Sequence, residues 1–300
     1  MATSLYKTSA TSKLQPLDVD FVTTNSTVSQ KRYGSPSSYS VSPLETALQT
    51  HPIVITTLGH FSIHKQGQVI NGPGNNQHKP TELLKLVIAL GSRSVGEVRI
   101  SDALWPDADG DVAHTSFSVT LHRIRKLLTM DTLQLCDGHL TLNPHICWVD
   151  VWALDSLLGQ IRNELNNSQT DLEIIRTLSN HALQLYQDHF LGNEDEQPWF
   201  IAFREKIKSR FIRCLTQVCD ALEQYGHCHL AIDFYRKGIE IEPLSEVFYQ
   251  RLMKCYVQRG RNIEAVNVYR QCEKLCRALT GAEPSASTQA IYREIVKTAT

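Results

Sequence analysis

The sequence predicts a mainly α-helical protein with a small β part: a winged helix-turn-helix domain followed by a tetratricopeptide-like repeat of helices. Two observations predict this. Between Ile100 and Asn143 a short helix, a turn, a long amphipathic helix and a hairpin follow one another, and in the C-terminal half five positions recur with a 34-residue period. We therefore expect a disordered Ser/Thr-rich tail over 1–50, a DNA-binding domain over 51–147 and a repeat domain over 148–300.

Composition limits the class of protein. The chain has 300 residues, is 42% apolar and carries a net charge of −1, and no apolar run approaches the length of a membrane span. Its eight cysteines include no Cys-x-x-Cys pair, and no secretory segment opens the chain, so we expect a cytoplasmic protein with reduced thiols. Residues 1–50 contain 18 Ser or Thr and no sustained periodicity, which predicts disorder.

Short β-branched runs begin at Pro52. Ile53–Leu58, Phe61–Ile63 and Gln68–Ile70 are separated by Gly or polar residues, as in a small antiparallel sheet. A polar loop then leads to a helix over 80–90, for which Thr81 is a candidate N-cap. Gly72, Gly74 and Lys79 do not fit a phosphate-binding loop, because no second Gly directly precedes the Lys.

The long helix over 112–130 has two different faces. One stripe is apolar and contains Phe117, Leu121, Ile124 and Leu128. The opposite face contains Thr115, Val119, His122 and Lys126, flanked by Ser118 and Arg125 on one side and Arg123 on the other. No carboxylate lies between Asp111 and Met130, whereas three cations do, which favours a helix presented to phosphates.

A hairpin follows this helix. Two alternating runs, 133–136 and 139–142, meet at Asp137-Gly138, a pair that allows the positive φ angles of a type I′ turn. His139 is either a wing contact to DNA or simply an exposed turn residue, and the sequence favours neither.

The C-terminal half has the period of tetratricopeptide helix pairs. The recurring positions are Leu222, Gly226, Ala231, Ile232 and Tyr235, matched by Tyr256, Gly260, Ala265, Val266 and Tyr269. A degenerate third unit is expected over His181–Arg213, with Gly192 in register with Gly226. Such arrays bind partners and carry no catalytic groups as a rule.

No catalytic constellation is visible, so we expect no enzyme and no cofactor. His227-Cys228-His229 has metal-capable atoms, but adjacent side chains point in different directions and no second cluster lies at zinc-finger spacing. We therefore expect no metal site.

The residues also carry a family resemblance. Lys79–Leu90, Asp102-Ala-Leu-Trp105, His122-Arg-Ile-Arg-Lys-Leu-Leu128, the Asp-Gly wing and Val149–Leu157 resemble bacterial transcriptional activators of the antibiotic-regulatory type. That family joins an OmpR-type winged helix to a bacterial transcriptional activation domain, and the resemblance covers residues 53 to about 296. It implies a regulator that binds tandem repeats upstream of promoters and recruits RNA polymerase, with the long helix as its recognition helix and Arg123 and Arg125 as its matching arginines. The chain departs from the family at Thr115 and Ser118, where a more basic or amide side chain is usual.

Position on the helix assigns the expected roles. Thr115, Ser118, Val119 and His122 face base edges in a major groove, with Val119 against a thymine methyl. Arg123, Arg125 and Lys126 clamp phosphates. The full predicted DNA-binding set adds Lys79 and Thr81 at the start of the preceding helix, and His139 in the wing.

An alternative remains open. The segment 51–145 balances eight Lys or Arg against eight Asp or Glu, so the outward face can instead be an ordinary solvated surface. The chain would then be a repeat-type protein-interaction adaptor without DNA binding. The expected partners under the first reading are double-stranded DNA and a second copy of the chain, with no membrane contact.

Overall fold

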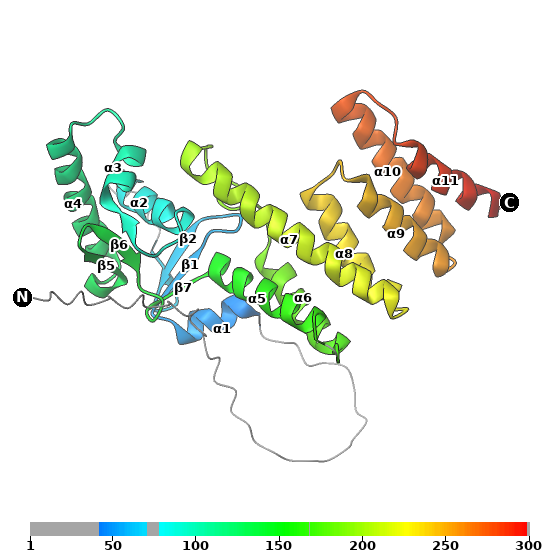
Figure 1. Cartoon of the computed structure of the whole chain (residues 1–300), viewed down its shortest axis with the longest axis horizontal. Coiled ribbons are helices and arrows are strands. Elements are labelled where there is room, and N and C mark those ends of the chain that lie inside the picture. Colours follow the sequence, from blue (N-terminus) through cyan, green and yellow to red (C-terminus); the bar gives the residue numbers. More distant parts are fainter. Residues whose placement is uncertain (1–41, 71–77, 168, 299–300) are drawn as a thin grey trace, which may run out of the picture. The chain divides into compact units, whose positions relative to one another are not determined.

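A computed structural model describes residues 42–70, 78–167 and 169–298, and these residues belong to one compact unit (Figure 1). Of the predicted disordered tail, residues 1–41 lie outside the described part. The prediction is wrong for its last residues, because Pro43–Thr50 forms helix α1. Ser42 and Glu45 make a reciprocal capping box at its start, and Ala47 is buried, so local capping and one packed face stabilise this helix.

One sheet has four strands in the order β3-β2-β1-β7. Its strands are β1 (Ile53–Thr56), β2 (Ser62–Lys65), β3 (Gln68–Val69) and β7 (Cys147–Val149). The first three are antiparallel neighbours, as predicted, whereas β7 runs parallel to β1 with Ile53 opposite Cys147. A strand of three residues has too little periodicity to be recognised in the sequence.

Three helices form the helix-turn-helix core: α2 (His78–Ala89), α3 (Glu97–Leu104) and α4 (Gly110–Leu127). α2 and α3 both pack on α4. The helix expected from residue 80 begins at His78, so the N-cap assignment of Thr81 is wrong, and its hydroxyl donates to the His78 carbonyl instead. Leu83, Leu84 and Phe117 are fully buried between these helices.

The wing is a three-stranded sheet in the order β4-β6-β5. β5 (Leu133–Cys136) and β6 (His139–Leu142) pair in the predicted hairpin, and β4 (Val95–Gly96) adds the third strand. Asp137 and Gly138 have φ angles of 49° and 72°, which confirms the predicted turn of two left-handed residues.

The described residues of the C-terminal part form seven helices. They are α5 (Asp150–Leu165), α6 (Leu172–Leu185), α7 (Pro198–Gln224), α8 (Cys228–Ile241), α9 (Glu246–Gln258), α10 (Asn262–Thr280) and α11 (Ala286–Thr298). Each helix from α7 to α11 packs against its neighbour in sequence (Figure 1). Gly226 and Gly260 have φ angles of 78° and 68° in the turns α7–α8 and α9–α10, so the 34-residue repeat is confirmed for these two helix pairs.

The expected third unit over His181–Arg213 is wrong. α6 ends at Leu185 and α7 begins only at Pro198, so Gly192 lies in a twelve-residue irregular connection rather than a tight turn. That connection reaches back to the sheet, where Leu58 and Phe190 form an isolated β-bridge. The first helix pair of this half is α5–α6 instead.

Buried contacts join the sheet and α2 to the C-terminal helices. Asp150, 4% exposed at the start of α5, accepts hydrogen bonds from the backbone N–H and hydroxyl of Thr57 and from the Leu58 N–H. Lys85 of α2 pairs with Glu194 at 2.7 Å and lies over the Phe61 ring. Most of the buried apolar side chains in the described ranges form one continuous cluster.

Candidate nucleic-acid interface

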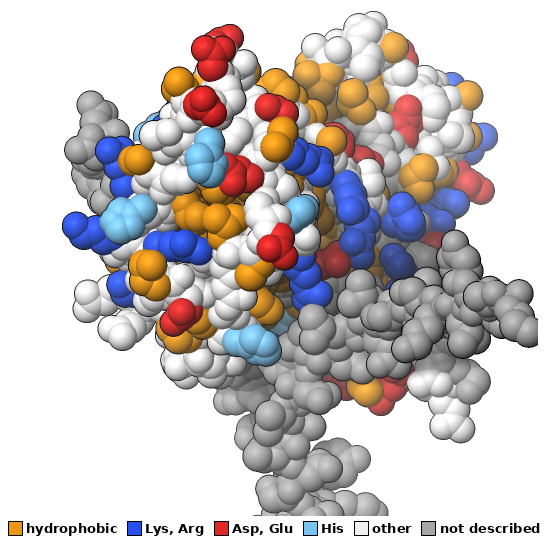
Figure 2. All heavy atoms as spheres, turned by 60° about the vertical axis from the view of Figure 1, so that its left-hand side comes forward, with side chains coloured by type: hydrophobic (Ala, Val, Ile, Leu, Met, Phe, Trp, Pro, Cys, Tyr) orange, Lys and Arg blue, Asp and Glu red, His pale blue; other side chains and the backbone are white. Residues whose placement is uncertain are grey.

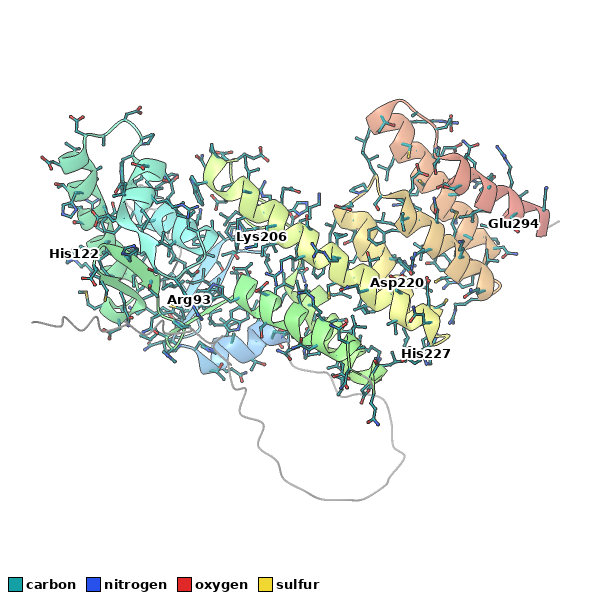
Figure 3. The ribbon with its side chains drawn as sticks, viewed as in Figure 1. Arg93, His122, Lys206, Asp220, His227 and Glu294 are labelled. Carbon is teal, nitrogen blue, oxygen red and sulfur yellow. The ribbon has the colours of Figure 1, made fainter. Side chains whose placement is uncertain are left out.

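The outer face of α4 is exposed along its whole length. Phe117 and Ile124 are fully buried, whereas Val119 is 45% exposed on the opposite side. The exposed residues that the sequence assigned to base contacts are Thr115, Ser118, Val119 and His122. Figure 3 labels His122 on α4, and Figure 2 brings this side of the molecule forward. An apolar side chain left exposed among small polar ones is suited to contact with a thymine methyl.

Two of the three cations of α4 are available on this face. Arg123 and Lys126 are exposed, and within the described ranges neither makes an ion pair. Arg125 is different: its Nε and Nη2 donate to the Leu133 carbonyl oxygen at 2.9 and 2.7 Å, which attaches the end of α4 to the first wing strand. The geometry thus gives Arg125 a structural role, whereas sequence spacing alone had grouped it with the phosphate contacts.

The predicted residues of α2 make contacts inside the domain. Lys79 Nζ lies 3.0 Å from the Glu82 carboxylate, and it donates a hydrogen bond of 3.3 Å to the Leu104 carbonyl oxygen. Thr81 is half-buried and its hydroxyl is bound to His78. The positive charge of Lys79 is therefore partly neutralised by the carboxylate of Glu82.

His139 stands exposed at the end of the wing turn. Its Nδ1 lies 2.8 Å from the Asp137 carbonyl oxygen, and its backbone pairs with Gly96 of β4. This contact fixes the imidazole beside the turn and leaves the ring accessible.

Acidic side chains lie at the start of α4. Asp107, Asp109 and Asp111 are all exposed, and Asp111 occupies the first turn, where the positive end of the helix dipole favours it. The His114 imidazole pairs with Glu97 of α3. In Figure 2 acidic side chains stand at the upper end of this side, and Lys, Arg and His side chains lie below them together with a few further acidic ones. The two ends of α4 therefore present opposite charge.

Two further cations were not predicted. Arg93, in the turn before β4, and Arg99, on α3, are exposed, and no ion pair is found for either among the described residues. Figure 3 labels Arg93. Neither residue belongs to a periodic pattern in the sequence. Their exposure is therefore visible only once the chain has folded around the wing and α3.

Comparisons with known proteins place the C-terminal half in a family. Residues 149–296 match the model of the bacterial transcriptional activator domain. None of the curated proteins compared with the sequence matches it.

Among solved structures, the chain is similar to Mycobacterium tuberculosis EmbR in complex with a low affinity phosphopeptide, with a TM-score of 0.60 and 16% identity. The match covers 82% of this chain and 65% of that one. At this identity it shows a shared fold. No helix in the described ranges is long and apolar enough to cross a membrane.

Together, the matched domain and the shared fold agree with the motifs in the sequence. Residues 149–296 thus match a bacterial transcriptional activator domain, and the chain joins this domain to a winged helix-turn-helix domain in a fold that it shares with EmbR.

Proposed function

We propose that the chain is a DNA-binding transcriptional activator that reads double-stranded DNA with the outer face of α4. The observation that carries this is the exposed row Thr115, Ser118, Val119 and His122, which continues into the exposed cations Arg123 and Lys126. The small residues and Val119 are placed for base edges, and the two cations for phosphates.

The wing supplies the second contact. His139 lies beside the tight turn of β5–β6, and a wing of this kind follows the backbone next to the groove that the recognition helix occupies. Because Arg125 attaches α4 to β5, helix and wing are presented as one rigid surface.

The net charge of the domain determines how tightly one copy binds. With eight cations against eight acids over 51–145, a single copy has little long-range attraction for DNA. We infer that two copies bind tandem sites together in the cytoplasm. The repeat domain then contacts RNA polymerase, for which exposed apolar side chains such as Ile263 (76%) and Leu279 (61%) offer surface.

The same charge balance favours a second candidate, a repeat-type adaptor whose N-terminal domain only docks proteins. Selection of bound fragments from random and genomic DNA pools separates the two. Recovery of a repeated motif supports the activator, whereas an unenriched pool from well-folded protein contradicts it and leaves the adaptor.

Base reading by α4 has its own test. Ser118→Ala should change the preferred sequence at one position of the recovered motif while leaving phosphate contacts intact. Ser156→Ala, an exposed serine of α5, is the matched control and should leave the motif unchanged. An unaltered motif in both variants would contradict base reading at Ser118.

A further inference from the structure

Three consecutive helices of the repeat domain bring two thiols and a carboxylate together. Glu223 comes from the last turn of α7, Cys228 from the start of α8 and Cys255 from α9. One ligand atom of each lies within 4.8 Å of the other two. Figure 3 labels Asp220, one turn before Glu223, and His227, next to Cys228.

We propose that Glu223, Cys228 and Cys255 form a binding site for a thiophilic divalent cation of the Zn²⁺ class. Zn²⁺ takes Cys sulfur at about 2.3 Å and carboxylate oxygen at about 2.0–2.2 Å, so tetrahedral ligand atoms lie about 3.5–3.8 Å apart. Since the three ligand atoms lie within 4.8 Å of one another, the triangle would contract by about 1 Å at most on binding the cation. The fourth position is left to water.

The surroundings suit a site of this charge. Two thiolates and a carboxylate carry three negative charges, and a divalent cation leaves one. The Arg251 guanidinium lies 3.3 Å from Glu223 and is paired also with Asp220, so the loaded site, Asp220 and Arg251 together carry one net negative charge. Both carboxylates are partly exposed, so solvent screens this charge.

Glu223 is also oriented from outside the triangle. The Tyr235 hydroxyl donates to Glu223 Oε1 while Arg251 donates to Oε2, so the carboxylate is held from two sides within 4.8 Å of the thiols. Partners of this kind set the direction of a ligand and tune its affinity.

The site is accessible from solvent. Cys255 is buried, whereas Cys228 is half-buried and Glu223 is 31% exposed, so the cation has a path from solvent. On binding, each thiol releases one proton to solvent as its bond to the metal forms, and the cation gives up bound water.

The site is not recognisable in the sequence because its ligands lie far apart along the chain. His227-Cys228-His229 attracts attention as a local metal motif, but the structure pairs Cys228 with Cys255, 27 residues later on the neighbouring helix. Among the described residues this is the one group of three or more ligating side chains close enough to share a cation.

Cadmium is the probe that tests the proposal, because its bond to a thiolate gives an ultraviolet charge-transfer band. The full chain, reduced with a phosphine and stripped with a chelator, should bind one Cd²⁺ with this band and then protect Cys228 and Cys255 from alkylation, as read by peptide mass spectrometry. Zn²⁺ should compete for the same site.

The variants make the test specific to these residues. Cys228→Ser, at the half-buried position, should abolish the band without unfolding the chain, and Glu223→Gln should weaken Cd²⁺ binding at least about tenfold. The matched controls are Cys276→Ser, from the neighbouring thiol pair on α10, and Asp220→Asn, the other carboxylate at Arg251; both should retain the site.

Three results would overturn the proposal. They are an unchanged band in Cys228→Ser, an equal loss in Cys276→Ser or Asp220→Asn, and no cadmium bound by the reduced chain. DNA does not enter the test, so its outcome is independent of the proposed function.

Discussion

Arg125 donates two hydrogen bonds from its guanidinium to the single carbonyl oxygen of Leu133. The end of α4 and the first wing strand are joined by this contact, while Arg123, two residues earlier, remains exposed to solvent. Neighbouring arginines of the same helix therefore have different roles, and their substitutions should have different effects.

Arg125→Ala should destabilise the fold. Loss of the charged donor leaves the Leu133 carbonyl without these bonds, and hydrogen bonds from charged groups are worth about 1.5–3 kcal/mol. Denaturant unfolding should show a decrease of that order in the free energy of unfolding. Arg123→Ala is the control and should stay within about 0.5 kcal/mol of the parent; equal stability of the two variants would contradict the structural role of Arg125.

Asp111→Asn should strengthen DNA binding. The exposed carboxylate lies in the first turn of α4, where it stabilises the helix through its interaction with the positive end of the helix dipole. The same negative charge repels DNA phosphates. Its removal should raise affinity in fluorescence anisotropy titrations, at a cost of about 0.3–1 kcal/mol in stability. Glu164→Gln, an acid of α5 outside the proposed interface, is the control. Weaker DNA binding by Asp111→Asn in a folded protein would place DNA on another face.

Asp150→Ala should lower the free energy of unfolding by roughly 3 kcal/mol or more. The carboxylate accepts bonds from two donors of Thr57 and from the N–H groups of Leu58 and Val151, so its removal leaves several buried donors unpaired. Because these bonds link β1 to α5, the loss should appear in thermal unfolding of the whole unit. Ser156→Ala on the same helix should have little effect, and a comparable effect would argue against the Asp150 network.

Glu246 should stabilise α11 in a pH-dependent way. Its carboxylate accepts bonds from the N–H and hydroxyl of Ser285 and from the Thr288 hydroxyl. Desolvation raises the pKa of Glu246, but the bonds from Ser285 and Thr288 outweigh it, so the pKa lies below its ordinary value of 4.5. A lowered pKa means that the stabilisation is complete above about pH 4.5 and is lost as the pH falls through the folded-state pKa.

Comparison of the parent with Glu246→Gln at several pH values checks this. The parent should be more stable by about 0.5–2 kcal/mol at pH 7, the usual value of a helix cap, and the difference should shrink in acid. A difference that does not change with pH would show that the ionised carboxylate is not responsible.

Regular, repeated patterns made much of this fold predictable. The apolar stripe of α4 at Phe117 and Ile124, the turn at Asp137-Gly138, and the repeat marked by Gly226 and Gly260 each follow from a backbone period or a required positive φ. Exposure along α4 follows from the same period, so the outward positions of Ser118 and His122 were predictable as well.

What the sequence did not predict depends on contacts between distant residues. The pairing of Arg125 with Leu133 requires the wing to fold back on α4, and the β-bridge between Leu58 and Phe190 replaces a third helix pair with an irregular connection. Helix α1 was missed because eight residues with a capping box lie within a Ser/Thr-rich context. No local periodicity encodes these features.

The salt dependence of DNA binding tests the central claim most directly, namely that α4 is turned outward to hold phosphates. For the full chain on a selected fragment, log K against log salt should fall steeply, with a slope of several units. Arg123→Ala and Lys126→Ala should each reduce the slope by about one, whereas Arg270→Ala, an exposed cation of α10, should not. A slope near zero, or one that Arg123→Ala and Lys126→Ala leave unchanged, would contradict this account.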